Sequence, residues 1–550
     1  MIRVDRLGNG TYGIVYSCTT PKGTEKYAVK RNLVEKDTNF IGSVRELDVL
    51  VRVREHPHLV YIACVSIGNP FKSPKDYSPL DPSERDSQRD DNLHFIFEEA
   101  SYDLHSYIYD CGEISFVLMK RYMVQLLLGL EYMHSKELIH RDIKPNNVLI
   151  FAHDQDLAGN IGTAKICDFG LSKPYTNQGD QTPNVVTSWY RAPEVALDCP
   201  NYDYMIDIWA MGCVMFEMVS RRPLIHVSCD NNVEVISKIL GKLPHEVDLS
   251  VVEEMANHKA CKGESIELTS SANPVRRKSL AERIDFTDQG LEQFKLEAGS
   301  FDLFCDLLNK MLQFEPHKRC TATEALNHPF FQDYSDLISA TRKEKVPGLS
   351  RYDICQPMIV TDCPERLWGM DAAIDIFNNR HLIHWYTHRT LFQAVDLYDR
   401  YISVMHYAYD QNRGVEIIET EDRGKIHTRY DAELRFLVCL YLCIKYFSSM
   451  HYPVAFSEIA TEKYLTPEAM STAEKFELAI IKDCLEYKVY RPTVYEIADK
   501  RGDKLEEEQV RDLLMIYCLT TWFNGMKPID LYDRYKDNGY SSEGLLEASS

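Results

Sequence analysis

Three glycines near the start of the chain have the spacing that phosphate binding requires. Gly8, Gly10 and Gly13 stand in the run Gly-Asn-Gly-Thr-Tyr-Gly, which follows a predicted strand. Glycines at this spacing allow a turn to lie close over a phosphate with backbone N–H groups directed at it. Dinucleotide-binding folds use a similar spacing, but there a helix follows the glycines. Here a second β-rich run follows instead, which favours a turn between two strands.

Lys30 and Glu46 form the next candidate pair. Lys30 ends the β-rich run Lys-Tyr-Ala-Val-Lys. Taken alone, a lysine at the end of a strand is an ordinary solvated side chain. Glu46 lies on the next predicted element, a helix over residues 39–54, where its carboxylate can pair with the Lys30 ammonium and direct it toward nucleotide phosphates. We therefore take both as candidate catalytic residues.

Three further motifs complete a known signature set. Residues 140–147 read HRDIKPNN, residues 168–170 read DFG and residues 192–194 read APE. Together with the glycines and Lys30, and in this order, they form the signature set of the protein kinases. Residues 1–331 therefore resemble a protein kinase domain, and the agreement of so many separated motifs excludes a purely structural reading of the group.

The resemblance implies a role for each residue. Asp142 would accept the proton of the substrate hydroxyl, and Lys144, the choice of serine/threonine kinases, would lie against the transferred phosphate. Asn147 and Asp168 would hold Mg²⁺, which neutralises charge on the β- and γ-phosphates of ATP. Asp207 would anchor the catalytic loop from a buried helix. The residues expected around ATP are Leu7, Gly8, Gly10, Gly13, Val15, Lys30, Glu98 and Ala100.

Within the protein kinases, the closest resemblance is to the cyclin-dependent kinases. Residues 185–194 read VVTSWYRAPE, which is nearly the end of that family's activation segment. Its Arg191 goes with kinases that prefer proline after the phosphorylated residue, so we expect protein substrates with Ser/Thr-Pro sites. Arg319 would pair with Glu194 in the large lobe.

The same resemblance implies regulation by phosphorylation. Thr182 stands at the position that the family phosphorylates for activation, and a phosphate there would add about −1.5 to −2 charge. Thr11 and Tyr12 in the glycine loop stand where family members accept inhibitory phosphates, although simple loop packing explains these two residues equally well. The cations expected to bind a phosphate on Thr182 are Arg45, Arg141 and Lys173.

The C-terminal part of the chain resembles a cyclin box. Residues 390–403 match its second helix, and residues 436–445 match its central buried helix. The implied role of this domain is to activate the kinase in cis, and the alternative is a scaffold whose helical half recruits other proteins. Asp371 stands where the family has an arginine for substrate docking. The residues expected at the kinase–cyclin interface are Val44, Lys445 and Glu477.

The predicted fold class is α+β, with a bilobal protein-kinase fold followed by an all-α cyclin-like domain. The expected small lobe covers residues 1–100 and the large lobe covers residues 101–331. The remaining predicted parts are a linker over 332–366, a cyclin box over 367–491, and a partial second helical repeat with a polar tail over 492–550.

Composition limits the partners and the compartment. The net charge of −21 opposes non-specific binding of nucleic acids and of anionic membranes. The 16 cysteines are scattered without a C-x-x-C pair, which indicates free thiols in a reducing compartment. We therefore expect an intracellular soluble protein, cytoplasmic or nuclear. Its expected partners are ATP, protein substrates and its own cyclin-like domain, with no nucleic acid and no membrane.

Overall fold

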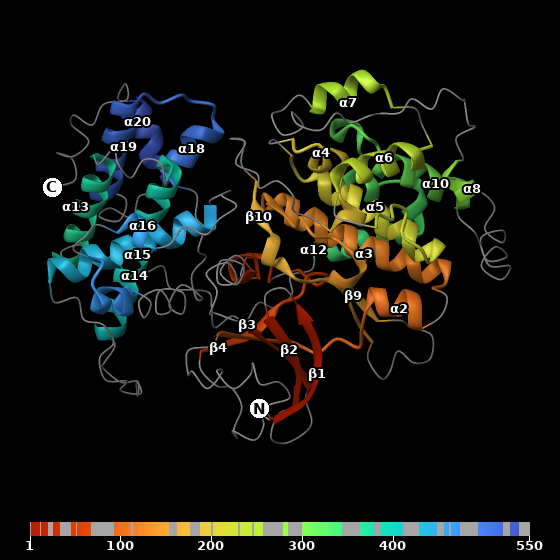
Figure 1. The fold of residues 1–550 in the computed structure, drawn as a ribbon, viewed down its shortest axis with the longest axis horizontal. Coiled ribbons are helices and arrows are strands. Elements are labelled where there is room, and N and C mark those ends of the chain that lie inside the picture. The colour runs from red at the N-terminus through yellow and green to blue at the C-terminus, as the bar shows by residue number, and fades with distance from the viewer. Residues whose placement is uncertain are drawn as a thin grey trace. The chain divides into compact units, whose positions relative to one another are not determined.

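In the computed structural model the chain forms two compact units (Figure 1). The described residues up to 343 form the first unit, and those from 364 onward form the second. The structure describes residues 2–10, 13–19, 26–32, 46–50, 52–54, 56–67, 93–111, 114–152, 162–175, 187–199, 202–228, 231–244, 247–256, 279–283, 300–343, 364–378, 386–410, 428–447, 456–460, 464–473, 493–520 and 528–537.

The first unit opens with a five-stranded antiparallel sheet, whose first strands are coloured red in Figure 1. The strand order is β1-β2-β3-β5-β4, so neighbouring strands are consecutive in the chain except for β3 and β5. The strands are β1 (Ile2–Gly10), β2 (Gly13–Thr19), β3 (Lys26–Asn32), β4 (Ile62–Ile67) and β5 (Leu93–Glu98). The β1–β2 pair is the hairpin that the glycine run predicted.

The register of this sheet separates two faces. Val15 lies opposite Lys30, and Ser17 lies opposite Ala28. Because side chains alternate along a strand, these four residues share one face. The other face carries the apolar core of the sheet, formed by Tyr16, Cys18, Val29 and Ile96. The face with Lys30 is therefore the one available to a nucleotide.

The large lobe is built on two long helices. α3 (Phe116–Ser135) begins where the Ser115 hydroxyl accepts a hydrogen bond from the backbone N–H of Leu118, a typical N-cap. α5 (Met205–Ser220) is buried on nearly all sides, as a central core helix must be. The other helices of this unit are α2 (Leu104–Asp110), α4 (Pro193–Ala196), α6 (Asn232–Lys242), α7 (Leu249–Ala256), α8 (Leu280–Arg283), α10 (Ser300–Met311), α11 (Ala322–Leu326) and α12 (Ser335–Lys343).

Two small sheets position the motif-bearing loops. β7 (Leu138–Ile139) pairs with β10 (Lys173–Pro174), and a second sheet has the order β6-β8-β9. Its strands are β6 (Tyr102–Asp103), β8 (Val148–Phe151) and β9 (Thr163–Ile166). The run 140–147 connects β7 to β8, and the run 168–170 follows β9. Because Val148 lies opposite Ile166 in the β8–β9 pair, the two runs are held beside each other.

Helix α12 occupies part of the segment in which a linker is predicted from the sequence. Arg342 Nη2 lies 2.7 Å from Glu131 Oε1 on α3. Just before α12, Asp333 Oδ2 lies 2.7 Å from Lys120 Nζ, also on α3. The buried residues of α12 are Ile338 and Thr341, so apolar periodicity gives little sign of this helix in the sequence.

The described residues of the second unit form helices and the turns that connect them, with no strand among them. Its helices are α13 (Pro364–Asn378), α14 (His388–Asp410), α15 (Arg429–Phe447), α16 (Phe456–Ile459), α18 (Val494–Lys500), α19 (Glu507–Thr520) and α20 (Pro528–Asp537). Every residue from 434 to 444 on α15 is buried, and α13, α14 and α16 all contact this helix. None of the described helices of either unit combines the length and apolar character needed to cross a membrane.

The first helix of this unit does carry a buried arginine. Arg366 on α13 donates two hydrogen bonds to the carboxylate of Asp399 on α14, at 2.7 and 3.0 Å. Asp371, which was matched to an arginine position in the sequence, is half exposed and lies 3.3 Å from Arg429. Asp371 therefore pairs with an arginine of α15 and takes no part in the buried pair of Arg366 and Asp399.

Helices α13 and α14 approach each other most tightly at Gly369. A Cβ atom at this position would lie 2.1 Å from Cε1 of Tyr398. The Tyr398 ring is fully buried and packs edge-on against Phe436 of α15, with the ring centres 5.6 Å apart. The ring has no space to withdraw, so a glycine is required at this crossing.

We predict that Gly369→Ala lowers the free energy of unfolding of the second unit by about 1–3 kcal/mol, the usual cost of overpacking. Gly241→Ala on α6 is the matched control, because a Cβ atom there meets no other atom within 4 Å. The control should be neutral or slightly stabilising, since alanine has the higher helix propensity. Denaturant titration of both variants measures the difference. Equal stability of Gly369→Ala and the wild type would contradict the proposed close packing.

Candidate active site

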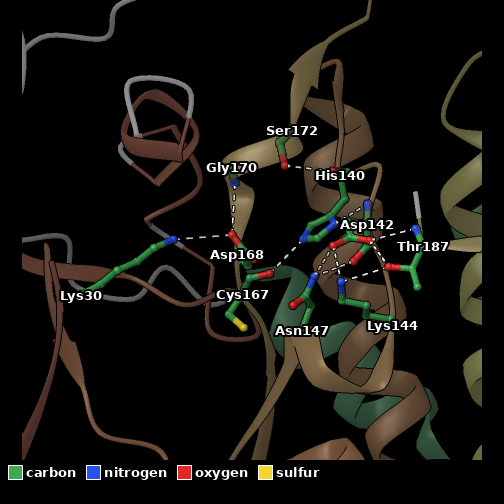
Figure 2. A network of polar contacts seen from close by, with 10 residues as sticks. All are labelled: Lys30, His140, Asp142, Lys144, Asn147, Cys167, Asp168, Gly170, Ser172 and Thr187. Carbon is green, nitrogen blue, oxygen red and sulfur yellow. Dashed lines mark hydrogen bonds and ion pairs between the residues drawn. The ribbon is translucent and has the colours of Figure 1, made fainter. Parts of the chain in front are cut away.

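The Lys30 side chain points toward the carboxylate of Asp168, as Figure 2 shows. Its Nζ atom lies 2.6 Å from Glu46 Oε2 and 3.6 Å from Asp168 Oδ1. Burial alone would lower the pKa of the Lys30 ammonium, but the charges of Glu46 and Asp168 outweigh it and raise the pKa. Lys30 therefore remains a cation, and its contact with Glu46 holds it beside Asp168.

Asp142 is held by three polar side chains (Figure 2). Lys144 Nζ lies 2.7 Å from Asp142 Oδ2, and Asn147 Nδ2 donates to the same oxygen at 2.9 Å. The Thr187 hydroxyl donates to Asp142 Oδ1 at 3.0 Å and accepts a hydrogen bond from Lys144, also at 3.0 Å. These contacts fix the orientation of a carboxylate that is almost completely buried.

The backbone around Asp142 is anchored by Asp207 on α5. The Asp207 carboxylate accepts hydrogen bonds from the backbone N–H groups of His140 and Arg141, both at 2.9 Å, and lies 3.1 Å from His134 Nε2. Burial would raise the pKa of Asp207, but the hydrogen bond and charge of His134 outweigh it and lower the pKa. The anchor therefore stays ionised and can hold both N–H groups.

Two residues of the site have left-handed backbone conformations that are unusual for a side-chain-bearing residue. Arg141 has φ 68° and Asp168 has φ 60°. Each such residue costs about 1–2 kcal/mol. The contacts of Asp207 stabilise Arg141, and the backbone N–H of Gly170 donates to Asp168 Oδ1 at 3.4 Å. This strain turns the Asp168 carboxylate toward Lys30.

Asp168 and Asn147 fit the requirements of a magnesium site. Burial would raise the pKa of Asp168, but the charge of Lys30 outweighs it and lowers the pKa. The amide nitrogen of Asn147 donates to Asp142, which leaves its amide oxygen as a ligand. Within the described residues, no group of three or more His, Cys, Asp or Glu side chains is placed to hold a metal ion. Mg²⁺ is commonly bound by one or two protein oxygens together with substrate phosphates, and Asp168 and Asn147 offer two such oxygens.

The segment after Thr187 forms a buried platform beside Asp142. Arg319 donates two hydrogen bonds to the carboxylate of Glu194, at 2.6 and 2.7 Å. The Tyr190 hydroxyl donates to Glu217 Oε2 on α5 at 2.7 Å. Between these two contacts, Arg191 Nη1 donates to Asn232 Oδ1 at 2.7 Å. The platform is therefore held on both sides of Arg191.

Comparison with known proteins decides the family. A model of the protein kinase domain matches residues 1–331. The chain belongs to the protein kinase family. It is 33% identical over 339 residues to mitogen-activated protein kinase 2 of Arabidopsis thaliana, which covers 61% of this chain and 78% of that protein. It is 32% identical over 339 residues to mitogen-activated protein kinase 3 of Oryza sativa subsp. japonica, which covers 61% of this chain and 79% of that protein.

The kinase is a serine/threonine kinase of the MAP kinase type, and it uses ATP and Mg²⁺. Residues 185–194 resemble the activation segment of the cyclin-dependent kinases, but these relatives are mitogen-activated protein kinases, which corrects the assignment to the cyclin-dependent branch. That run is too short to separate the two groups. The match to the protein kinase domain ends at residue 331, so it does not extend to the second unit.

The expected nucleotide contacts of the kinase lie on neighbouring parts of the small lobe. Leu7, Gly8 and Gly10 lie on β1, where Gly10 pairs with Gly13 and Gly8 with Val15 of β2. A Cβ atom on Gly13 would lie 2.1 Å from the carbonyl oxygen of Arg31, so only glycine fits. Glu98 is the last residue of β5, and Ala100 lies two positions after it. These placements keep the eight residues as candidates for ATP contacts.

Several regulatory candidates lie outside the described residues. They are Thr11, Tyr12, Val44, Arg45, Thr182 and Glu477, and Lys445 lies on α15 without a described side chain. Arg141 and Lys173 are described and almost fully buried. Arg141 donates to the carbonyl of Leu171 and to the Tyr202 hydroxyl, so part of its hydrogen-bonding capacity is already used.

Thr187 is the main site residue that the sequence did not assign. It stands in the run VVTSWYRAPE, which was recognised, but nothing in that run shows contact with a loop far away in the chain. The one sequence feature that could have assigned Thr187 to the site is its hydroxyl, shortly before the APE motif.

We predict that Asp142→Asn lowers kcat for phosphoryl transfer at least about 100-fold, because the proton acceptor is lost. The affinity for Mg-ADP should stay within about twofold, since the nucleotide contacts remain. Asp306→Asn on α10 is the matched control, because Asp306 is half exposed and pairs with Lys310 away from the site. Steady-state kinetics and calorimetric titration give the two values. Transfer by Asp142→Asn at near the wild-type rate would refute the assignment.

Proposed function

We propose that this kinase transfers the γ-phosphoryl group of ATP to serine or threonine residues that precede proline. The arrangement around Asp142 carries the proposal, because it joins a buried carboxylate, a lysine at 2.7 Å and an oriented hydroxyl at one point. Such a set can position an attacking hydroxyl and stabilise the charge of the transferred group.

In this mechanism, Asp142 takes the proton from the substrate hydroxyl as the hydroxyl oxygen bonds to the γ-phosphorus and the bond to the ADP oxygen breaks. Lys144 lies on the same side as Asp142 and stabilises charge on the transferred group. Lys30, directed by Glu46, holds the phosphates on the nucleotide side. Asn147 and Asp168 would hold Mg²⁺, which would neutralise further phosphate charge.

The preference for proline rests on the platform after Thr187. A proline has no backbone N–H. A substrate with proline after its acceptor residue therefore has no N–H at that position that could be left without a hydrogen-bond partner. Arg191 and its contact to Asn232 support this preference, because the side chain helps to hold the platform beside Asp142. The MAP kinase relatives support the same substrate class.

We further propose that the second unit activates the kinase in cis as a cyclin-like domain. Two observations support the proposal: the buried central helix α15, and the charged pair that joins α13 to α14. A tether of a few tens of residues gives a local concentration in the millimolar range, so even a weak interface would stay occupied. The proposed interface residues are Val44, Lys445 and Glu477. The second candidate is a recruitment module on the same kinase.

We predict that residues 1–348 alone have at most about one tenth of the kcat/KM of the whole chain. Adding residues 349–550 as a separate protein should restore activity only at high concentration, because the tether is lost. The thermal unfolding of residues 1–348 is measured in parallel, so that loss of activity is not confused with loss of folding. Full activity of a folded residues 1–348 would contradict activation in cis and favour the recruitment module.

Thr182 is proposed as a site of phosphorylation between two molecules of this kinase. Thr182 is followed by Pro183, so the site has the form that the proposed specificity prefers. A phosphate there would be bound by Arg45, Arg141 and Lys173, which would join three parts of the kinase in one charge cluster.

We predict that protein made in a kinase-free host acquires phosphate on Thr182 during incubation with Mg-ATP. The initial rate per molecule should rise with protein concentration, because the reaction is bimolecular. Mass spectrometry follows the site, and Thr182→Ala serves as the control for its identity. The inactive Asp142→Asn protein should be phosphorylated only when active kinase is added. A rate independent of concentration would oppose the proposal.

A further inference from the structure

Residues 98–101 join β5 of the small lobe to β6 beside the large lobe, and their side chains reach in both directions. The Glu98 carboxylate lies 3.3 Å from Lys165 Nζ on β9 of the large lobe. The Ser101 hydroxyl donates to the carbonyl of Ala152, at the end of β8, at 3.2 Å. The Glu99 carboxylate instead accepts a hydrogen bond of 2.6 Å from the Ser17 hydroxyl on β2. The connection is thus held from both lobes.

The contact between Ser17 and Glu99 lies on the nucleotide-facing side of the small lobe. Ser17 is buried and lies opposite Ala28, on the face that also carries Val15 and Lys30. Tyr16 and Cys18, its neighbours on β2, belong to the apolar core on the other face. A serine hydroxyl in such a strand must find a partner, because an unsatisfied buried polar group is costly. Glu99 is that partner.

We propose that the hydrogen bond from Ser17 to Glu99 fixes the distance between β2 and the connection from β5 to β6, and thereby the width of the nucleotide-binding site. This inference rests on the proposed nucleotide site, whose candidate residues include Val15 on β2 and Glu98 and Ala100 at and just after the end of β5. Glu99 stands between Glu98 and Ala100, and Ser17 stands two positions from Val15 on the same face. The hydrogen bond therefore holds Val15 at a fixed distance from Glu98 and Ala100.

Ser17 and Glu99 are positioning residues, since they act on the nucleotide through their neighbours. Neither belongs to the motifs that carry the phosphoryl chemistry, and Asp142 and Asp168 lie on other elements. A looser slot should weaken nucleotide binding and leave the transfer step unchanged once the nucleotide is bound. The effect should therefore fall on KM for ATP and not on kcat.

The test uses the whole chain with Ser17→Ala, Glu99→Leu and Glu99→Gln. Ser17→Ala and Glu99→Leu remove the hydrogen bond, and each should weaken Mg-ADP binding and raise KM for ATP about fivefold. Glu99→Gln keeps an oxygen that accepts from Ser17, so its values should return to within about twofold of the wild type. The double variant Ser17→Ala with Glu99→Leu should be no weaker than either single variant, because both remove one shared contact.

Ser135→Ala at the end of α3 is the matched control, since it also removes one serine hydrogen bond, to the carbonyl of Tyr132. It should change neither KM for ATP nor kcat. A merely structural role of Ser17 would lower the unfolding temperature without changing Mg-ADP affinity, and that result would overturn the inference. If Glu99→Leu does not fold, Ser17→Ala and Glu99→Gln still decide the question. Failure of the wild type itself to bind Mg-ADP would instead reject the proposed nucleotide site.

Discussion

The catalytic loop depends on one buried carboxylate. Asp207 holds the backbone N–H groups of His140 and Arg141, and through them it maintains a left-handed residue immediately before Asp142. Without that anchor, Arg141 would relax toward an ordinary conformation and Asp142 would turn away from Lys144 and Thr187. The rigid helix α5 supplies the anchor, so the core of the large lobe directly determines the geometry of the chemistry.

Much of the site could be predicted from the sequence, because phosphoryl transfer needs particular residue types in a particular order. Lys30, Glu46, Asp142, Asn147 and Asp168 lie in local runs whose chemistry is evident. The bilobal arrangement followed from a β-rich start and a helical continuation. The pairing of Lys30 with Glu46 was expected, and the structure has it at 2.6 Å.

Contacts between distant parts of the chain could not be predicted in the same way. Thr187 meets Asp142 only because the segment after it is fixed by Glu194 and Arg319. Helix α12 buries a single apolar side chain, that of Ile338, so its apolar pattern does not distinguish it from a linker. The pairing of Arg366 with Asp399 joins residues 33 positions apart, and no local run indicates it. The catalytic residues also could not distinguish a MAP kinase from a cyclin-dependent kinase, since both branches share the residues that perform the chemistry.

The two units each contain a doubly hydrogen-bonded ion pair that is shielded from water. Arg319 and Glu194 are at most 3% exposed, and Arg366 and Asp399 are at most 4% exposed. Dissolved salt screens exposed charges over a length of about 8 Å at physiological ionic strength, but it acts little on buried ones. The net charge of −21 adds a self-repulsion that the same salt reduces. Rising ionic strength therefore does not weaken these two buried ion pairs. At the same time it reduces the repulsion between negative charges, which opposes a compact folded state.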